Sequence, residues 1–401
     1  MYDRRALPRR TLPVIAFALA LAGCGDPPPA APRPSGGFVG AATCGECHAD
    51  RWRGFQRTAH HLTSREPSKE TVLGSFDAPA NRLVTGNSSL SFEMEAKPAG
   101  LFVTAHLAGG KSRSERIDFV VGSGKLGQSY LSWRGAGLFE LPVSYLAAGA
   151  AWRNSPGNRY RDGTADFDRA ILPRCLECHA TWFGMSPTFA GGYVKDGAVL
   201  GISCERCHGP GAEHVAWHRA HPDAKEAVAI TSPADLTRER SLELCGQCHG
   251  GVGELAGAPF SYRPGEDLAD HVHTKPADPA APPDVHSANQ LMRLKQSKCF
   301  QGSEKMTCAT CHDPHVFERG DLARFSKRCL ECHAAKACLM EPRVGAAITA
   351  NCIDCHMTRL AIHSTVFDTP GAQLHPTMVD HRVGIDRAAT EKYFASHPTP
   401  K

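Results

Sequence analysis

The pentapeptide Cys-x-x-Cys-His occurs seven times in the 401 residues, and no other feature limits the possible folds as strongly. The copies begin at Cys44, Cys175, Cys204, Cys245, Cys308, Cys329 and Cys352. Chance at this composition would give roughly 0.04 copies. Two residues between the cysteines place both sulfurs on one side of a turn, where they can form thioethers to the two vinyl groups of a haem. The histidine that follows can then bind the iron. The sequence therefore predicts seven covalently bound haem c groups.

Each motif is expected to supply two thioether sulfurs and one proximal iron ligand. The predicted thioether residues are Cys44, Cys47, Cys175, Cys178, Cys204, Cys207, Cys245, Cys248, Cys308, Cys311, Cys329, Cys332, Cys352 and Cys355. The predicted proximal ligands are His48, His179, His208, His249, His312, His333 and His356. Zinc would need cysteine pairs joined into closed four-ligand sites, and would leave the following histidine unexplained. A thioredoxin-like redox site would need a single pair beside a βαβ pattern.

Histidines outside the motifs are candidates for the opposite, distal face of each haem. The candidate distal ligands are His60, His61, His214, His273, His286, His315, His363 and His381, with one ligand expected from the pair His60 and His61. His315 follows the proximal His312 by only three residues, so it would ligate a neighbouring haem rather than its own. The same argument applies to His214, six residues after His208. His218 and His221 are alternatives, whereas His106 and His397 are expected at the surface.

The chain resembles the multihaem c-type cytochromes, and in particular the cytochrome c-554/c-prime-like group. The resemblance covers about residues 40–66 and 171–382. It rests on the motifs and on three phrases, Gly201-Ile-Ser-Cys-Glu-Arg-Cys-His-Gly-Pro-Gly-Ala-Glu-His214, Met306-Thr-Cys-Ala-Thr-Cys-His-Asp-Pro-His315 and Asp380-His-Arg382. In related proteins, histidines in similar contexts are distal ligands. The motifs specify the cofactor far more closely than they specify the function.

The N-terminus has the pattern of a bacterial export signal. Four arginines precede an apolar run from Val14 to Ala22, which is short of the roughly 20 residues that a spanning helix needs. Cys24 follows Leu-Ala-Gly, which resembles the lipobox of lipoproteins; the alternative is a chance cysteine beside an ordinary cleavage site. We expect a signal peptide over residues 1–23, then a lipidated Cys24 and a Pro-rich tether over residues 24–38. The lipid would anchor the protein at the periplasmic face of a membrane, and whether that membrane is the inner or the outer one stays open.

Motif spacing divides the rest of the chain into a first haem-binding segment (39–67), a segment without motifs (68–170), a six-haem domain (171–383) and a tail (384–401). About thirty residues per haem cannot build a core of their own, so short helices and loops should surround stacked haems. In the segment without motifs, Leu90–Met94 and Leu101–Leu107 alternate with a period of two. The expected fold is a mostly irregular and α-helical multihaem cytochrome with a small inserted antiparallel sheet.

Charge and the remaining cysteines limit the partners. The chain has 45 Lys and Arg against 41 Asp and Glu, a near balance that gives no electrostatic reason to bind nucleic acid. Haem propionates would make the mature protein net negative, which suits redox partners with basic patches. Cys299 and Cys338 lie outside the motifs and, in an oxidising compartment, form either a disulfide or two buried thiols beside haem.

Three functions fit this sequence. The first is an electron relay between periplasmic or membrane redox partners, such as a quinol-linked donor or a terminal reductase, through closely packed, mostly bis-His haems. The second is an oxidoreductase acting on a small nitrogen or sulfur oxyanion or hydroxylamine at one open haem. All seven motifs end in His, and the Lys-ended variant of the resembling nitrite reductases is absent, so the relay is favoured and no catalytic residue is assigned. The third is a subunit of a cytochrome filament or outer-membrane conduit.

Overall fold

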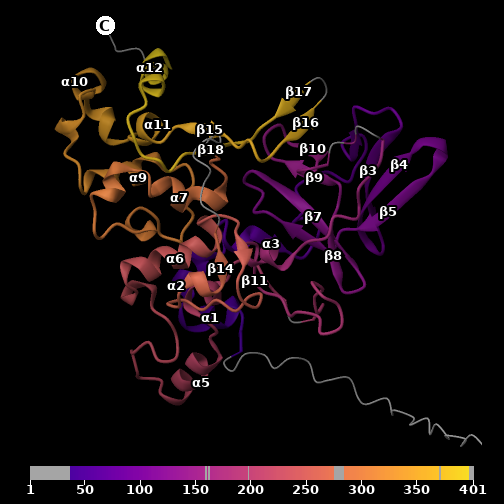
Figure 1. The fold of residues 1–401 in the computed structure, drawn as a ribbon, viewed down its shortest axis with the longest axis horizontal. Helices are drawn as coiled ribbons and strands as arrows, with labels where there is room; N and C mark the ends of the chain where they lie inside the picture. Colours follow the sequence, from indigo (N-terminus) through magenta and orange to yellow (C-terminus); the bar gives the residue numbers. More distant parts are fainter. Residues whose placement is uncertain are drawn as a thin grey trace, which may run out of the picture.

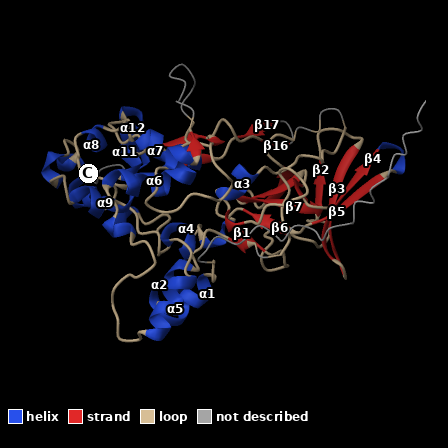
Figure 2. Cartoon of the chain, turned by 60° about the horizontal axis from the view of Figure 1, so that its bottom comes forward, coloured by secondary structure: helices blue, strands red, loops and turns tan. Residues whose placement is uncertain are grey.

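Strands and helices occupy opposite ends of the molecule (Figures 1 and 2). The computed structural model describes residues 37–158, 160, 163–196, 198–274, 284–369 and 372–396. The predicted signal peptide, Cys24 and His397 lie outside the described residues. Phe38, at the end of the predicted tether, already packs on the folded body, with its ring centroid 5.4 Å from that of Trp182. Within the described ranges, no helix combines the length and apolarity that crossing a membrane requires.

Two antiparallel sheets, rather than one small sheet, form the strand-rich end. The first has the order β2-β3-β4-β5, from β2 (Arg82–Val84), β3 (Leu90–Lys97), β4 (Gly100–Leu107) and β5 (Ser112–Arg116). The second has the order β1-β6-β7-β9-β10, with β8 paired to β7. Its strands are β1 (Ser64–Arg65), β6 (Phe119–Val121), β7 (Gly127–Arg134), β8 (Gly137–Glu140), β9 (Val143–Leu146) and β10 (Ala151–Asn154).

Strands β5, β8 and β9 could not be predicted from the sequence, for physical reasons. Strand β5 reads Ser-Arg-Ser-Glu-Arg. Its residues alternate between exposed and partly buried, but none of them is hydrophobic, so the sequence shows no hydrophobic alternation there. Strands β8 and β9 are buried at three of their four positions, because neighbours cover both faces, and such strands do not alternate. The alternating runs, in contrast, form β3 and β4 as predicted.

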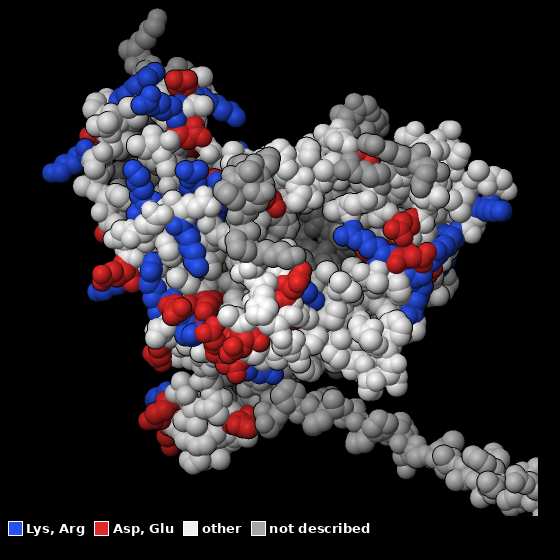
Figure 3. Space-filling view, in the orientation of Figure 1, with Lys and Arg blue, Asp and Glu red and all other residues white. Residues whose placement is uncertain are grey.

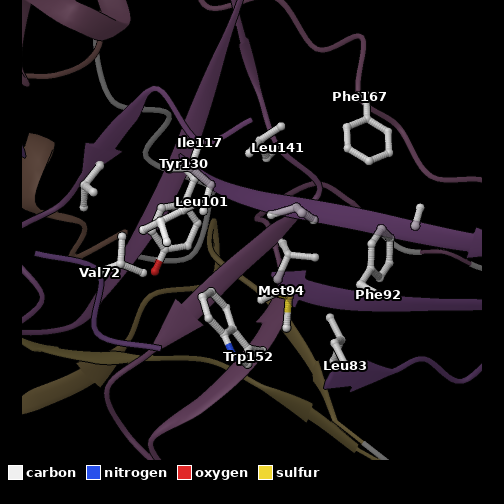
Figure 4. Close-up of a cluster of buried hydrophobic side chains, with 14 of the residues drawn as sticks. Val72, Leu83, Phe92, Met94, Leu101, Ile117, Tyr130, Leu141, Trp152 and Phe167 are labelled. Carbon is white, nitrogen blue, oxygen red and sulfur yellow. The ribbon is translucent and has the colours of Figure 1, made fainter. Parts of the chain in front are cut away.

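The two sheets share one hydrophobic core (Figure 4). Pairing of β3 with β4 sets Met94 opposite Val103 and Phe92 opposite Ala105, so that all four side chains are buried on one face. Tyr130 from β7 and Trp152 from β10 pack against this face from the second sheet, with ring centroids 5.6 Å apart. This end of the molecule therefore has a core made of protein side chains alone.

Gly74 marks a close approach to this core. A Cβ at residue 74 would overlap the indole ring of Trp152, whereas a Cβ at Gly86 would meet no atom within 4 Å. We expect Gly74→Ala to lower the free energy of unfolding by about 1–3 kcal/mol, because the indole must shift within a packed core. Gly86→Ala should change it by less than about 0.5 kcal/mol. Chemical denaturation followed by far-UV circular dichroism compares the two, and equal effects would contradict the close packing of Trp152 on residue 74.

Short helices make up the other end, and half of the twelve described helices contain residues of a motif. They are α1 (Ala41–Cys47), α2 (Ala49–Phe55), α3 (Pro173–Glu177), α4 (Cys204–His208), α5 (Ala212–Ala220), α6 (Arg238–His249), α7 (Gln290–Leu294), α8 (Lys298–Gln301), α9 (Leu322–Leu330), α10 (Glu341–Val344), α11 (Ile353–His356) and α12 (Arg387–Ser396). Helix α6 shows how local sequence sets one of them. The hydroxyl of Thr237 accepts from the backbone N–H of Arg240 at its start, and the motif histidine His249 is its last residue. The predicted tail forms α12, which packs on α11.

The C-terminal segment returns to the strand-rich end through small hairpins. Strand β15 (Arg359–Ala361) pairs with β18 (Thr377–Val379), and β16 (Phe367–Thr369) pairs with β17 (Ala372–Leu374). The side chain of Asn154 in β10 accepts a 2.6 Å hydrogen bond from the backbone N–H of Asp368. The remaining short strands form two further pairs, β11 (Ala180–Trp182) with β12 (Val199–Leu200) and β13 (Glu254–Leu255) with β14 (Val272–His273).

Candidate haem-binding site

One continuous cavity of about 4230 Å³ runs through the helical end, and all seven motifs line it. The two cysteines and the histidine of every motif are among the lining residues. A pocket for one drug-sized ligand has about 300–1,000 Å³, so this cavity has room for several large ligands. Because every predicted thioether sulfur and proximal histidine faces the same space, the residues present fit a stack of haem c groups.

Contacts between cysteines of different motifs give the order of the motifs in space. We number the motifs 1 to 7 along the chain. Sulfur contacts join motifs 1 and 3 (Cys44 with Cys204), 2 and 4 (Cys178 with Cys248), 4 and 5 (Cys245 with Cys308), and 6 and 7 (Cys329 with Cys352). Weaker electrostatic interactions link motif 3 to motif 4 and motif 5 to motif 6. The motifs therefore follow the spatial order 1-3-4-5-6-7, with motif 2 beside motif 4.

Three proximal histidines face a second histidine across the cavity at a spacing that suits one iron between them. An imidazole nitrogen binds a first-row transition metal at about 2.0–2.1 Å, so two rings on opposite sides of one iron have centroids roughly 6.3–6.5 Å apart. The observed centroid distances are 6.1 Å for His249 with His60, 6.1 Å for His208 with His315, and 6.0 Å for His312 with His381. Each pair joins residues from different parts of the chain.

At motif 2 a histidine lies near the proximal ligand, and at motif 1 helix α5 lies beside the motif. Burial and the neighbouring His286 lower the pKa of His179 to about 4. At motif 1, Arg219 on α5 forms a 3.1 Å ion pair with Glu46, which lies between the two cysteines of that motif. This contact holds α5 alongside motif 1, and His214 on α5 lines the cavity.

Hydrogen bonds to Nδ1 leave Nε2 as the nitrogen available for metal in several of these histidines. The Nδ1 acceptors or partners are the carbonyl of Thr231 for His208 (3.0 Å), the carbonyl of Val228 for His214 (2.9 Å), the carboxylate of Asp313 for His315 (3.0 Å) and the carbonyl of Gly384 for His356 (2.9 Å). His218 instead uses Nε2, which lies 3.1 Å from the carbonyl of Glu226. Both nitrogens of His271 are engaged, by Ser261 and Glu266.

The eight candidate distal histidines divide into two groups. Five of them line the cavity, namely His60, His214, His286, His315 and His381. The other three, His61, His273 and His363, are not among the described lining residues. His61 packs against the rings of Trp52 and Phe55, while His273 and His363 are exposed. Adjacent positions in the chain, His60 and His61, therefore face different surroundings.

Cys299 and Cys338 are free thiols that line the cavity at different motifs. Cys299 interacts with Cys311 and Cys329, whereas Cys338 interacts with Cys355. They are not paired with each other, so the structure corresponds to the thiol alternative and not to the disulfide.

Charged residues inside the motifs, which were not predicted as functional from the sequence, connect the motifs to other segments of the chain. Glu177, between Cys175 and Cys178, accepts a 2.6 Å hydrogen bond from the backbone N–H of Phe260 and pairs with Arg174 at 3.1 Å. Glu205, in motif 3, accepts from the backbone N–H groups of Val39 and Gly40 at 2.8 and 2.9 Å. The two positions between the cysteines of a motif normally face solvent. The only signal in the sequence that Glu177 and Glu205 make structural contacts was therefore their charge at these positions.

Comparison with known proteins agrees with the site. A family model for cytochrome c554 and c-prime matches residues 150–209. The dissimilatory sulfite reductase MccA of Wolinella succinogenes is 21% identical over 80% of this chain and 50% of that protein. The multiheme cytochrome MtrA of Shewanella baltica is 24% identical over 40% of this chain and 52% of that protein. The chain thus spans about half the length of the curated relatives it matches.

A solved structure shares the fold. The outer cell wall cytochrome OcwA superposes with a TM-score of 0.54 at 18% identity, covering 90% of this chain and 84% of that one. This likeness, the family match and a single cavity lined by every Cys-x-x-Cys-His motif confirm the resemblance seen in the sequence. The chain is a multihaem c-type cytochrome.

Proposed function

We propose that this protein is a heptahaem electron relay, in which the haems of motifs 1 to 5 are bis-His ligated and pass electrons between redox partner proteins. The observation that carries the proposal is the shared cavity, because seven haems attached around one space must lie close to each other. Electron tunnelling falls steeply with distance, so closely spaced rings form a conducting path that needs no substrate-binding machinery.

The proposal includes a distal ligand for each of the five haems. The pairs are His48 with His214 for motif 1, His179 with His286 for motif 2, His208 with His315 for motif 3, His249 with His60 for motif 4, and His312 with His381 for motif 5. Ring spacing supports the last three pairs, and the placement of α5 and of His286 supports the first two. Bis-His ligation leaves no open iron position and favours lower reduction potentials than His/Met ligation.

We further propose that the protein works outside the cytoplasm. The sequence of residues 1–24 supports export and lipidation at Cys24, which would tether the relay to a membrane surface. A quinol-linked donor or a terminal reductase would then be the partner within reach. Globomycin-sensitive processing and metabolic labelling with palmitate test lipidation, and Cys24→Ala should abolish the label.

One specific observation supports the alternative function, an oxidoreductase that acts on a small oxyanion. MccA, similar over half its length, is named a dissimilatory sulfite reductase. That activity would need a haem with an open position, which the five proposed pairs do not provide. The relay is therefore the better-supported function for motifs 1 to 5.

The neighbours His60 and His61 give a sharp test of the ligand pairs. His60→Ala should convert one low-spin ferric haem to a high-spin one, because His249 loses the ring that faces it. His61→Ala should leave the haem signals unchanged, since His61 packs against Trp52 and Phe55. Low-temperature electron paramagnetic resonance of the fully oxidised proteins, quantified per seven haems, measures both. The ligand assignment fails if the two variants give the same spectrum as the wild type.

A further inference from the structure

Motifs 6 and 7 differ from the other five in what faces their histidines. With five lining histidines assigned to motifs 1 to 5, the one other described lining histidine outside the motifs is His218. His218 lies on α5, at the bottom of the molecule in Figure 1, whereas α10, α11 and α12 lie at the top. Among the described residues that line the cavity, therefore, no second histidine outside the motifs lies at the end that holds His333 and His356.

The cavity is open to solvent at this end. His333 and Cys332 are both exposed, and two large apolar residues that line the cavity, Leu339 and Ile385, are 88% and 84% exposed. At the opposite side of motif 7, the Thr390 hydroxyl of α12 forms a hydrogen bond with Cys355. The thioether side of motif 7 is thus covered, while motif 6 lies beside exposed residues.

Positive charge gathers at the same end. Arg319 and Arg359 both line the cavity, and within the described ranges neither forms an ion pair with a carboxylate. Burial and, after it, the positive charge of the nearby Arg359 lower the pKa of Arg319, in the direction expected for repulsion between like charges. In Figure 3, many Lys and Arg side chains lie over the region of α9 to α12 with a few Asp and Glu among them, while a larger group of Asp and Glu lies below it near α6. An anion, either a haem propionate or a small dissolved ion, would relieve this repulsion.

We propose that the haem irons at His333 and His356 each keep a sixth position that takes a small exogenous ligand, with anionic ligands favoured in the ferric state. The relay would then run from five bis-His haems to two ligand-accessible haems at its C-terminal end. This inference rests on the proposed loading of seven haems and adds to it the place where small molecules reach the iron.

Carbon monoxide is the first probe, because it binds ferrous haem only where an iron position is free. Titration of the dithionite-reduced full chain, followed by the Soret difference spectrum, should saturate at two carbon monoxide molecules per seven haems. Haem content is counted on the same sample as the pyridine haemochrome. Fewer than seven haems would overturn the proposed relay itself, whereas seven haems with fewer than two bound ligands would overturn only the proposed open positions.

Matched variants locate the two positions. His381→Ala should raise the count from two to three, because it opens the iron facing His312, and this confirms that the assay detects an added position. Met340→Ala and His397→Ala should each leave the count at two. A rise in either variant would mean that the replaced side chain had occupied one of the irons, and would contradict the proposal. Azide and sulfite added to the ferric wild type should perturb the high-spin signal of the same two haems, and Arg359→Ala should weaken this binding at least about threefold.

Discussion

Cells that express the double variant Cys245→Ala/Cys248→Ala are expected to yield at least about tenfold less folded holoprotein than cells that express the wild type. These cysteines belong to motif 4, whose sulfurs contact motif 2 through Cys178 and motif 5 through Cys308. Without the haem of motif 4, the centre of the 4230 Å³ cavity loses the group that fills it, and the surrounding short helices keep only small clusters of buried side chains, such as Leu242 with Leu291 and Phe300.

Motif 1 supplies the matched control. It stands at the end of the spatial order, and among the described motifs its sulfurs contact only motif 3, so Cys44→Ala/Cys47→Ala should give a folded protein with six haems. Yield, haem content per chain and the far-UV spectrum measure both variants. In the material that the central variant does produce, electrons introduced by a reductant pulse should equilibrate in two separate phases, since motifs 1 and 3 are cut off from motifs 5 to 7. Similar yields and one phase in both variants would contradict the spatial order 1-3-4-5-6-7.

Asp380→Ala should lower the free energy of unfolding by about 3–5 kcal/mol. Asp380 accepts hydrogen bonds of 2.8 and 2.6 Å from Arg293, and the two side chains are only 8% and 11% exposed. Removing the carboxylate leaves the guanidinium buried without a counter-charge, which is costlier than the loss of the pair as such. The bond also joins α7 to the segment that carries His381, so the haem of motif 5 should become partly high-spin.

An exposed ion pair gives the control for Asp380. Arg53 pairs with Asp50 on α2, where the two side chains are 74% and 90% exposed. Arg53→Ala should cost less than about 1 kcal/mol, because water screens an exposed pair. Chemical denaturation monitored in the Soret band compares the variants, and a cycle with Arg293→Ala isolates the coupling. A cost for Asp380→Ala no larger than that for Arg53→Ala would refute the role assigned to the buried pair.

The sequence predicted the attachment chemistry well because a thioether pair and its proximal histidine are local. Cysteines two residues apart and the next histidine lie within one turn, so spacing alone specifies them. Distal ligands are a different case. His60 and His249 lie 189 positions apart in the chain, and only the packed structure brings them to 6.1 Å. The spacing of His312 and His315 predicts that His315 ligates the haem of another motif, but it does not predict that this is motif 3.

The strand-rich end shows the same limit. The runs that became β3 and β4 have one face in the core and one in water, so hydrophobic alternation revealed them. Strand β5 is entirely polar, and its place in the sheet is set by pairing with β4. Likewise, nothing local indicates that Glu205 holds the backbone of Val39 and Gly40, because its partners precede it by some 165 positions.

The sulfur contacts between motifs also constrain how the protein can mature. Cys44 lies against Cys204, Cys178 against Cys248, Cys245 against Cys308 and Cys329 against Cys352. A chain that reached this conformation before receiving its haems, in an oxidising compartment, could close four disulfides and lose eight attachment sulfurs. Attachment of haem while the motifs are still unfolded and reduced would keep these sulfurs available for thioether bonds.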